Sequence, residues 1–198
     1  MTIVKKLSNN CLDFIKDNTS ISEENLEKIH YGIQVILLTI TKDILLLTTA
    51  YLLGVLKYTI IAVMIFGLLR TFTSGVHSNS TFQCIIYCYT FFLGNVYLSL
   101  NLSLNTILKS IIFAISFILI LLYAPGDTEE RPLVSKKIRR NLKIKSAILV
   151  IIFYITILFI ENNVYSNLIT FSIFEVSLVI TPIAYKFFGK KRDNYKNI

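Results

Sequence analysis

One short segment of the chain combines residue types that can carry out nucleophilic chemistry. It runs from Arg70 to Cys84, joins two apolar stretches, and places His77 seven residues before Cys84. A nucleophilic cysteine needs a nearby base to take its proton and surroundings that favour the thiolate. His77 and Cys84 are therefore a candidate general base and nucleophile.

The spacing of this pair leaves two geometries open. On one continuous helix, seven residues rise by about 10.5 Å, which is too far for a direct contact between imidazole and thiol. If the helix begins after His77, the loop can fold the imidazole over the first turn, and Gly75 allows a sharp bend. Ser80 followed by Gln83 is a capping-box pattern, which favours this second geometry. Cys84 would then lie in an opening turn, where the helix dipole favours a thiolate and unpaired N–H groups can stabilise an oxyanion.

The same residues also have an ordinary structural interpretation. Cysteine is a common small apolar residue in buried helices, and a histidine at a membrane boundary is unremarkable. Cys88, one turn after Cys84, is expected to pack within its helix, and Cys11 and His30 are expected to be boundary residues. His-x6-Cys is a weak motif when it is taken by itself.

Long apolar runs must position this segment. Hydrophobic residues make up 54% of the 198 residues and charged residues only 16%. A soluble domain could not hide so much apolar surface, whereas lipid can solvate it. We therefore expect an all-α, polytopic membrane bundle of about six spans. The expected spans are 33–56, 58–69, 84–100, 105–123, 147–160 and 168–188. The second run is short, so a re-entrant segment is an alternative there.

Lysine and arginine gather between the apolar runs and at the two ends of the chain. There are four in the N-terminal arm, seven in the 124–146 connection and five at the C-terminal end. Basic connections stay in the cytoplasm, so both termini and the 70–83 connection are expected there. This distribution makes the net charge of +8 a topology signal and argues against nucleic-acid binding. The expected parts are a cytoplasmic or interfacial segment (1–30), a membrane domain (31–188) and a basic tail (189–198).

Several short patterns in the chain also match a known family. The pattern Arg-x4-Gly-x-His-x6-Cys between two spans is formed by Arg70, Gly75, His77 and Cys84. Tyr-Ala-Pro stands at 123–125, Tyr-Gly-Ile-Gln at 31–34, and Arg-Pro-Leu at 131–133, where family members commonly have Lys-Pro-Ile. In these features the chain resembles the accessory gene regulator B (AgrB) family, the membrane cysteine endopeptidases of Gram-positive peptide quorum sensing.

The resemblance implies an enzyme of the Gram-positive cell membrane with its active site at the cytoplasmic face. Its substrate would be an AgrD-like precursor peptide, which loses its C-terminal tail and is cyclised to a thiolactone or lactone autoinducer. Cys84 would be the nucleophile and His77 the general base. Gly75 matches the motif, and Arg70 would hold a substrate carboxylate, the loop itself or a lipid phosphate. No cofactor is implied, and the sequence lacks a histidine-rich set of metal ligands.

Ionisable residues inside the apolar runs are further candidates. Lys42 and Asp43 fall in the first expected span and Glu175 in the last, where charged groups are costly and are usually paired or functional. Asp43 would pair with Lys42 or orient His77, as the third member of a catalytic triad does. Lys42 and Glu175 are alternative substrate contacts, and Lys109 is expected to snorkel to the membrane surface.

Other functional classes fit part of the sequence. A small transporter or channel would explain the spans and intramembrane charges, although the spans show no obvious inverted repeat. A non-catalytic membrane scaffold would explain everything except the 70–84 segment. The basic 131–145 stretch fits contact with anionic lipids or an electrostatic dock for an acidic precursor tail. Self-association into a homo-oligomer is a further expectation.

Overall fold

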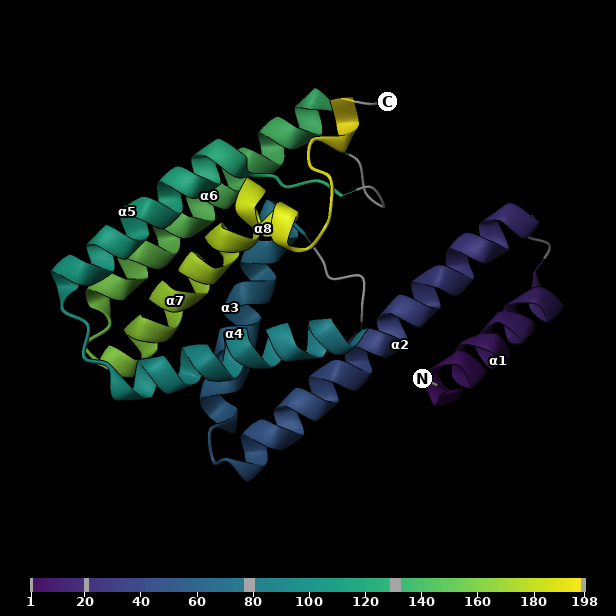
Figure 1. Ribbon diagram of the computed structural model, residues 1–198, viewed down its shortest axis with the longest axis horizontal. Coiled ribbons are helices and arrows are strands. Elements are labelled where there is room, and N and C mark those ends of the chain that lie inside the picture. Colours follow the sequence, from purple (N-terminus) through teal and green to yellow (C-terminus); the bar gives the residue numbers. More distant parts are fainter. Residues whose placement is uncertain (1, 20–21, 77–80, 129–132, 197–198) are drawn as a thin grey trace. The chain divides into compact units, whose positions relative to one another are not determined.

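The computed structural model describes residues 2–19, 22–76, 81–128 and 133–196. The regular secondary structure assigned in these ranges is helical (Figure 1), and isolated bridge residues, among them the pair Ser74 and Gly126, are the exception. The chain divides into two compact units, one ending at Leu52 and the other beginning at Leu53. The prediction of an all-α protein is confirmed.

The first unit is a pair of helices, α1 (Thr2–Asn18) and α2 (Glu23–Leu52). The two helices pack together, and the His30 ring on α2 joins them. Its Nε2 lies 3.3 Å from the Ser8 hydroxyl and 3.1 Å from the Asn9 side-chain oxygen, both on α1. The expected interfacial segment is therefore a helix attached to the start of the first apolar helix.

The second unit is built around one central helix. Its helices are α3 (Leu56–Thr73), α4 (Thr81–Asn101), α5 (Thr106–Tyr123), α6 (Lys136–Phe159), α7 (Asn163–Val179), α8 (Pro182–Phe187) and a short 3₁₀ turn (Asn194–Lys196). Helix α7 contacts α3, α4, α5 and α6, and Figure 1 shows it running alongside α5 and α6. Ten residues of α7 are buried, many of them small or polar, because small side chains let helix backbones approach closely.

Five helices among the described residues are long and apolar enough to cross a membrane. They are α2, α3, α4, α5 and α6, and many of their large hydrophobic side chains are exposed. Such surfaces need lipid as a solvent, so the prediction of a membrane bundle is confirmed. The second predicted run is an 18-residue helix, α3, which has the length of a full span. Helix α7 has 17 residues, and a total of six spans stays a prediction.

Several predicted boundaries differ from the structure, among them those of the first span (33–56), which is the helix Glu23–Leu52. Helix α6 begins at Lys136 rather than near 147, because Ser135 caps it and lysine and arginine are good helix formers. The last predicted span, 168–188, is two helices: α7 starts earlier, at Asn163, and the chain breaks between Val179 and Pro182. The break arises because Thr181 caps α8 and Pro182, at its first position, cannot donate a backbone hydrogen bond.

Candidate functional site

The loop that leads toward His77 is held by Arg70, in the last turn of α3. One terminal nitrogen of its guanidinium donates to the Ser74 carbonyl at 2.6 Å, and the other donates to the Val76 carbonyl. Of the three roles considered for Arg70, these contacts match the one in which it holds the loop itself. The planar guanidinium can bind two carbonyls at once, which a lysine could not do in the same geometry.

Gly75 lies where no other residue would fit. Its φ is +118°, and a Cβ there would meet the Arg70 guanidinium and lie 2.9 Å from the Ile180 side chain. The next residue, Val76, is buried, and its N–H donates to the Val179 carbonyl at 3.4 Å. The loop is therefore held between Arg70 on one side and the end of α7 on the other.

A second glycine, Gly126, supports the same loop from the connection after α5. Its N–H donates to the Thr73 carbonyl at 2.8 Å. A Cβ on Gly126 would lie 2.8 Å from the Gly75 Cα and 2.6 Å from the Tyr185 hydroxyl. The two glycine backbones thus lie against each other, and a side chain on Gly126 would push them apart.

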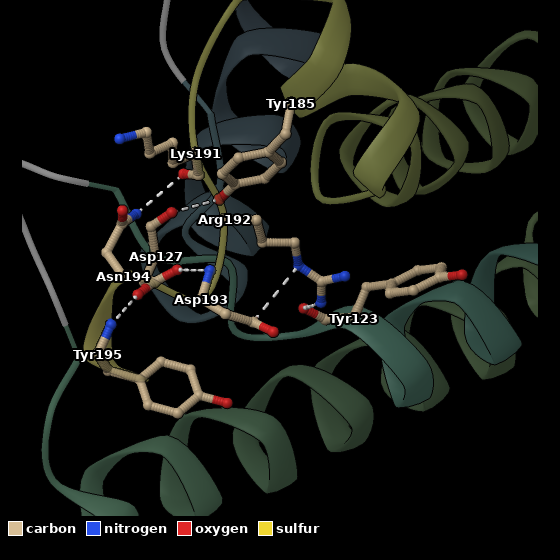
Figure 2. A network of polar contacts seen from close by, with 8 residues as sticks. All are labelled: Tyr123, Asp127, Tyr185, Lys191, Arg192, Asp193, Asn194 and Tyr195. Carbon is tan, nitrogen blue, oxygen red and sulfur yellow. Dashed lines mark hydrogen bonds and ion pairs between the residues drawn. The ribbon is translucent and has the colours of Figure 1, made fainter. Parts of the chain in front are cut away.

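Asp127, which directly follows Gly126, joins the connection to the C-terminal segment. Its side chain accepts backbone hydrogen bonds from Asp193 at 2.8 Å and Tyr195 at 3.0 Å (Figure 2). The Tyr185 hydroxyl donates to the Asp127 carbonyl at 2.7 Å. Burial raises the pKa of Tyr185 to about 12, so this hydroxyl keeps its proton. We call residues 189–195 the C-terminal strap, since they lie across this connection.

Cys84 lies in the first turn of α4, as the capping pattern predicts. It is half-buried, as is Cys88 one turn later, whereas Cys11 is exposed on α1. Between the two α4 cysteines, the Tyr87 ring packs on Phe188 with centroids 4.7 Å apart. This contact holds the start of α4 near the end of α8. His77 and Ser80 lie outside the described residues, so the predicted His77–Cys84 contact stays a prediction.

The intramembrane ionisable residues have partners that the sequence does not reveal. Glu175, half-buried on α7, accepts a hydrogen bond from Asn95 of α4 at 3.3 Å. Lys109 is only 6% exposed and donates to Asn163 at 3.0 Å and to Ser166 at 2.7 Å, so the prediction that it snorkels is wrong. These two acceptors were not predicted, because the polar residues at the start of α7 resemble a connection between spans.

Lys42 and Asp43 lie on α2, in the first unit. A contact between Asp43 and His77 therefore stays a prediction. The described residues contain no group of three histidine, cysteine, aspartate or glutamate side chains that could hold a metal ion.

Comparison with known proteins assigns the sequence of the chain to a family. The profile of the family described as "Accessory gene regulator B" matches residues 8–181. An AgrB-like protein of Clostridium acetobutylicum is 32% identical over 183 residues, covering 91% of this chain and 88% of its own. The chain belongs to the AgrB family.

Further relatives support the same assignment to the AgrB family. An AgrB-like protein of Listeria welshimeri is 28% identical and is aligned over 98% of this chain and 97% of its own length. The accessory gene regulator protein B of Staphylococcus aureus is 27% identical over 87% of this chain and 91% of its own. No solved structure matches the chain. Membership of the AgrB family supports a role in accessory gene regulator quorum sensing.

The sequence motif shared with the AgrB family covers only part of this site. Arg70 and Gly75 contact one another, but Gly126, Asp127 and Tyr185 also belong to the site and were not predicted. The Tyr-Ala-Pro pattern at 123–125 marks the connection that carries two of them, although it gives no sign of their contacts.

Proposed function

We propose that this member of the AgrB family is a membrane cysteine endopeptidase. It cleaves the C-terminal tail from an AgrD-like precursor peptide at the cytoplasmic face and promotes cyclisation of the remaining peptide. Cys84 is the nucleophile and His77 the general base. The observation that carries the proposal is the position of Cys84, half-buried in the opening turn of α4 after a well-anchored loop.

The opening turn of a helix suits a nucleophilic thiol for two reasons. Its first backbone N–H groups have no partner within the helix, and the dipole places partial positive charge there. Both favour a thiolate, and the same N–H groups can stabilise an oxyanion on an attacked carbonyl. Cys88, one turn further into α4, lacks these advantages, so the proposal assigns the chemistry to Cys84 alone.

The anchored loop supports the role of His77. Three contacts hold the chain up to Val76. Arg70 binds two loop carbonyls, and the Val179 carbonyl accepts one hydrogen bond from the Val76 N–H. The backbone of Gly75 also lies against that of Gly126. Because the backbone of Val76 is fixed, the His77 side chain that follows it can reach only a limited set of positions. Seven residues of chain are ample to let the His77 imidazole reach the Cys84 thiol.

In the first chemical step, His77 takes the Cys84 proton and the thiolate attacks a precursor carbonyl. The tetrahedral intermediate collapses, the C–N bond breaks, and His77 returns the proton to the leaving amine of the tail. The retained acyl group is now a thioester on Cys84. In the second step, an internal thiol or hydroxyl of the precursor loses its proton to His77 and attacks the thioester. Cys84 leaves as a thiolate, and the product is a cyclic thiolactone or lactone.

Water competes with the internal nucleophile in the second step. The half-buried position of Cys84 beside the membrane limits the access of water to the thioester. When the internal nucleophile is a thiol, one thioester is exchanged for another, so this ring-closing step changes little bond energy. The limited access of water is therefore the feature that favours cyclisation over simple hydrolysis.

Loss of cleavage in matched variants tests the proposal. The full chain is co-expressed with its cognate precursor, and cleavage is followed on gels. Cys84→Ser should abolish cleavage, and His77→Ala should slow it by about 10²–10⁴-fold, the usual contribution of a general base. Cys88→Ser and Cys11→Ser are the matched controls and should cleave normally.

Membrane insertion of each variant is checked by fractionation before its activity is compared. Normal cleavage by an inserted Cys84→Ser protein would exclude the proposed mechanism. Flux of an ion or solute through liposomes that contain the purified chain would instead favour a transporter. The Asn95 contact gives Glu175 a structural role, which weakens the main argument for transport.

A further inference from the structure

A basic cleft lies between the connection after α5, the first turns of α6 and the C-terminal strap. Its volume is about 490 Å³, within the range of about 300–1,000 Å³ that is usual for small-ligand sites. Five cations line it: Lys136, Arg139, Arg140, Lys143 and Arg192. Asp193 is the acidic residue in the lining. Such an excess of positive charge selects an anionic ligand.

The walls of the cleft are fixed by contacts within the protein. The Arg139 guanidinium lies 3.4 Å from the centroid of the Tyr195 ring, and that of Arg192 lies 4.7 Å from the Tyr123 ring. Arg192 also donates to the Tyr123 carbonyl at 3.2 Å, as Figure 2 shows. Since Asp127 holds the strap through two backbone N–H groups, the cleft is formed before any ligand binds.

The apolar side of the cleft continues into a lipid-facing surface. Leu122 lines the cleft and is 62% exposed. Ile111, Ile115 and Ile118 are also exposed on α5, and with Leu122 they recur at intervals of three or four residues. These four side chains therefore lie on one helical face, which ends at the cleft.

The position of the cleft matches the depth of lipid headgroups. The apolar helix α5 ends at Tyr123, and the basic first turns of α6 stand at the same end of the bundle. Tyrosine and basic residues at the ends of spans belong to the membrane interface. A ligand in the cleft would thus lie where phospholipid phosphates are found.

We propose that this cleft binds the phosphate headgroup of an anionic phospholipid, whose acyl chains lie along the exposed face of α5. Arg139, Arg140 and Lys143 supply charge for the phosphate, and arginine can bind two phosphate oxygens at once. A zwitterionic headgroup would bring its own cation against five others and is disfavoured. An acidic peptide would satisfy the charges but would have no apolar chain to continue along the stripe that ends at Leu122.

Lipid retention by the purified full chain tests this proposal. The protein is equilibrated in mixed micelles of phosphatidylglycerol and phosphatidylcholine in equal amounts, and bound lipid is counted by native mass spectrometry. The wild type should retain phosphatidylglycerol preferentially. Arg140→Gln combined with Lys143→Gln removes two lining charges and should reduce that preference by on the order of tenfold. Lys137→Gln with Lys145→Gln removes two charges from the same helix outside the cleft lining and should leave the preference unchanged.

A second measurement needs no variant. Phosphatidylglycerol should raise the unfolding temperature of the wild type, whereas phosphatidylcholine and free glycerol 1-phosphate should not, because a ligand that binds only the folded state stabilises it. Equal losses in both double variants would mean bulk attraction and overturn the site. Stabilisation by glycerol phosphate alone would assign the cleft to a soluble phosphate. Saturable binding of an acidic peptide without lipid preference would assign it to a peptide, and either result would overturn the lipid site.

Discussion

At the scale of single residues, the contact between Gly75 and Gly126 decides the shape of the candidate site. Neither glycine can carry a side chain, for different reasons. Gly75 has a positive φ and is enclosed by Arg70 and Ile180, whereas Gly126 lies against the backbone of Gly75 and the hydroxyl of Tyr185. The space beside each glycine is filled by backbone atoms and by the side chains of Arg70, Ile180 and Tyr185.

Gly75→Ala should therefore destabilise the protein and disturb the loop. A strained φ costs about 1–3 kcal/mol, and the clash with Ile180 adds to it. The unfolding temperature in detergent should fall, and precursor cleavage should fall further than stability alone explains. Gly67→Ala is the matched control, since a Cβ there meets nothing within 4 Å and the residue lies within helix α3. An equal fall in both variants would show that the Gly75 environment is not special.

At the scale of elements, the C-terminal strap is the segment whose structural role is hardest to predict from the sequence. Its residues are basic and polar, which is typical of a solvated tail. In the structure, Asp127 is 4% exposed and fixes the strap through two backbone N–H groups, and Arg139 and Tyr123 hold it from the sides. The strap is thus part of the folded unit.

Asp127→Asn should release the strap. The amide keeps one acceptor oxygen but presents an N–H₂ group to the other backbone donor, and hydrogen bonds to charged groups are worth about 1.5–3 kcal/mol. Trypsin should then cut after Lys190, Lys191 or Arg192 faster by on the order of tenfold, as local opening becomes easier. Asp193→Asn is the control: it retains the backbone N–H and tolerates the φ of 59° found there. Identical digestion of the two variants would contradict the role of Asp127.

The boundaries that sequence predicted well are those with local signals. Asn105 caps α5, and the run 105–123 matches the helix Thr106–Tyr123 almost residue for residue. The start of α6 was missed because Lys136 to Lys145 is helical without being apolar. The start of α7 was missed because Asn163 and Ser166 gain their partner, Lys109, from another helix.

The residues of the candidate site also divide into those with a local sequence signal and those without one. Arg70, Gly75 and the opening-turn position of Cys84 follow from spacing, capping and the family pattern. Asp127 could not be predicted, because its partners are backbone N–H groups 66 and 68 residues away, which carry no side-chain signature. Tyr185 was assigned to a continuous last span, so its contact with the Asp127 carbonyl could not be expected.

At the scale of the whole molecule, most of the basic residues discussed above lie at one end of the second unit. The ends of α3, α5 and α7 and the start of α6 meet where Arg70, the cleft cations and the strap lie. The opposite end carries Lys57 at the start of α3 and Lys109 near the start of α5. By the positive-inside rule, we expect the end with the motif to face the cytoplasm.

Site-directed labelling tests this orientation. In a background where the three native cysteines are serine, Glu161→Cys lies in the connection between α6 and α7 and should react with a membrane-impermeant maleimide in intact cells. Lys190→Cys, in the strap, should react only after permeabilisation. The reverse pattern would place the motif outside the cell and would remove the cytoplasmic precursor from its reach.

The dependence of the Gly75 loop on distant partners has a consequence for biosynthesis. The loop emerges from the ribosome first, but Val179 and Tyr185 follow it by four helices. A nascent chain that has inserted α3 and α4 therefore carries Cys84 before the contacts that hold the Gly75 loop have formed. The loop can be completed only after Val179 and Tyr185 have been translated, which would keep shorter nascent chains from acting on their substrate.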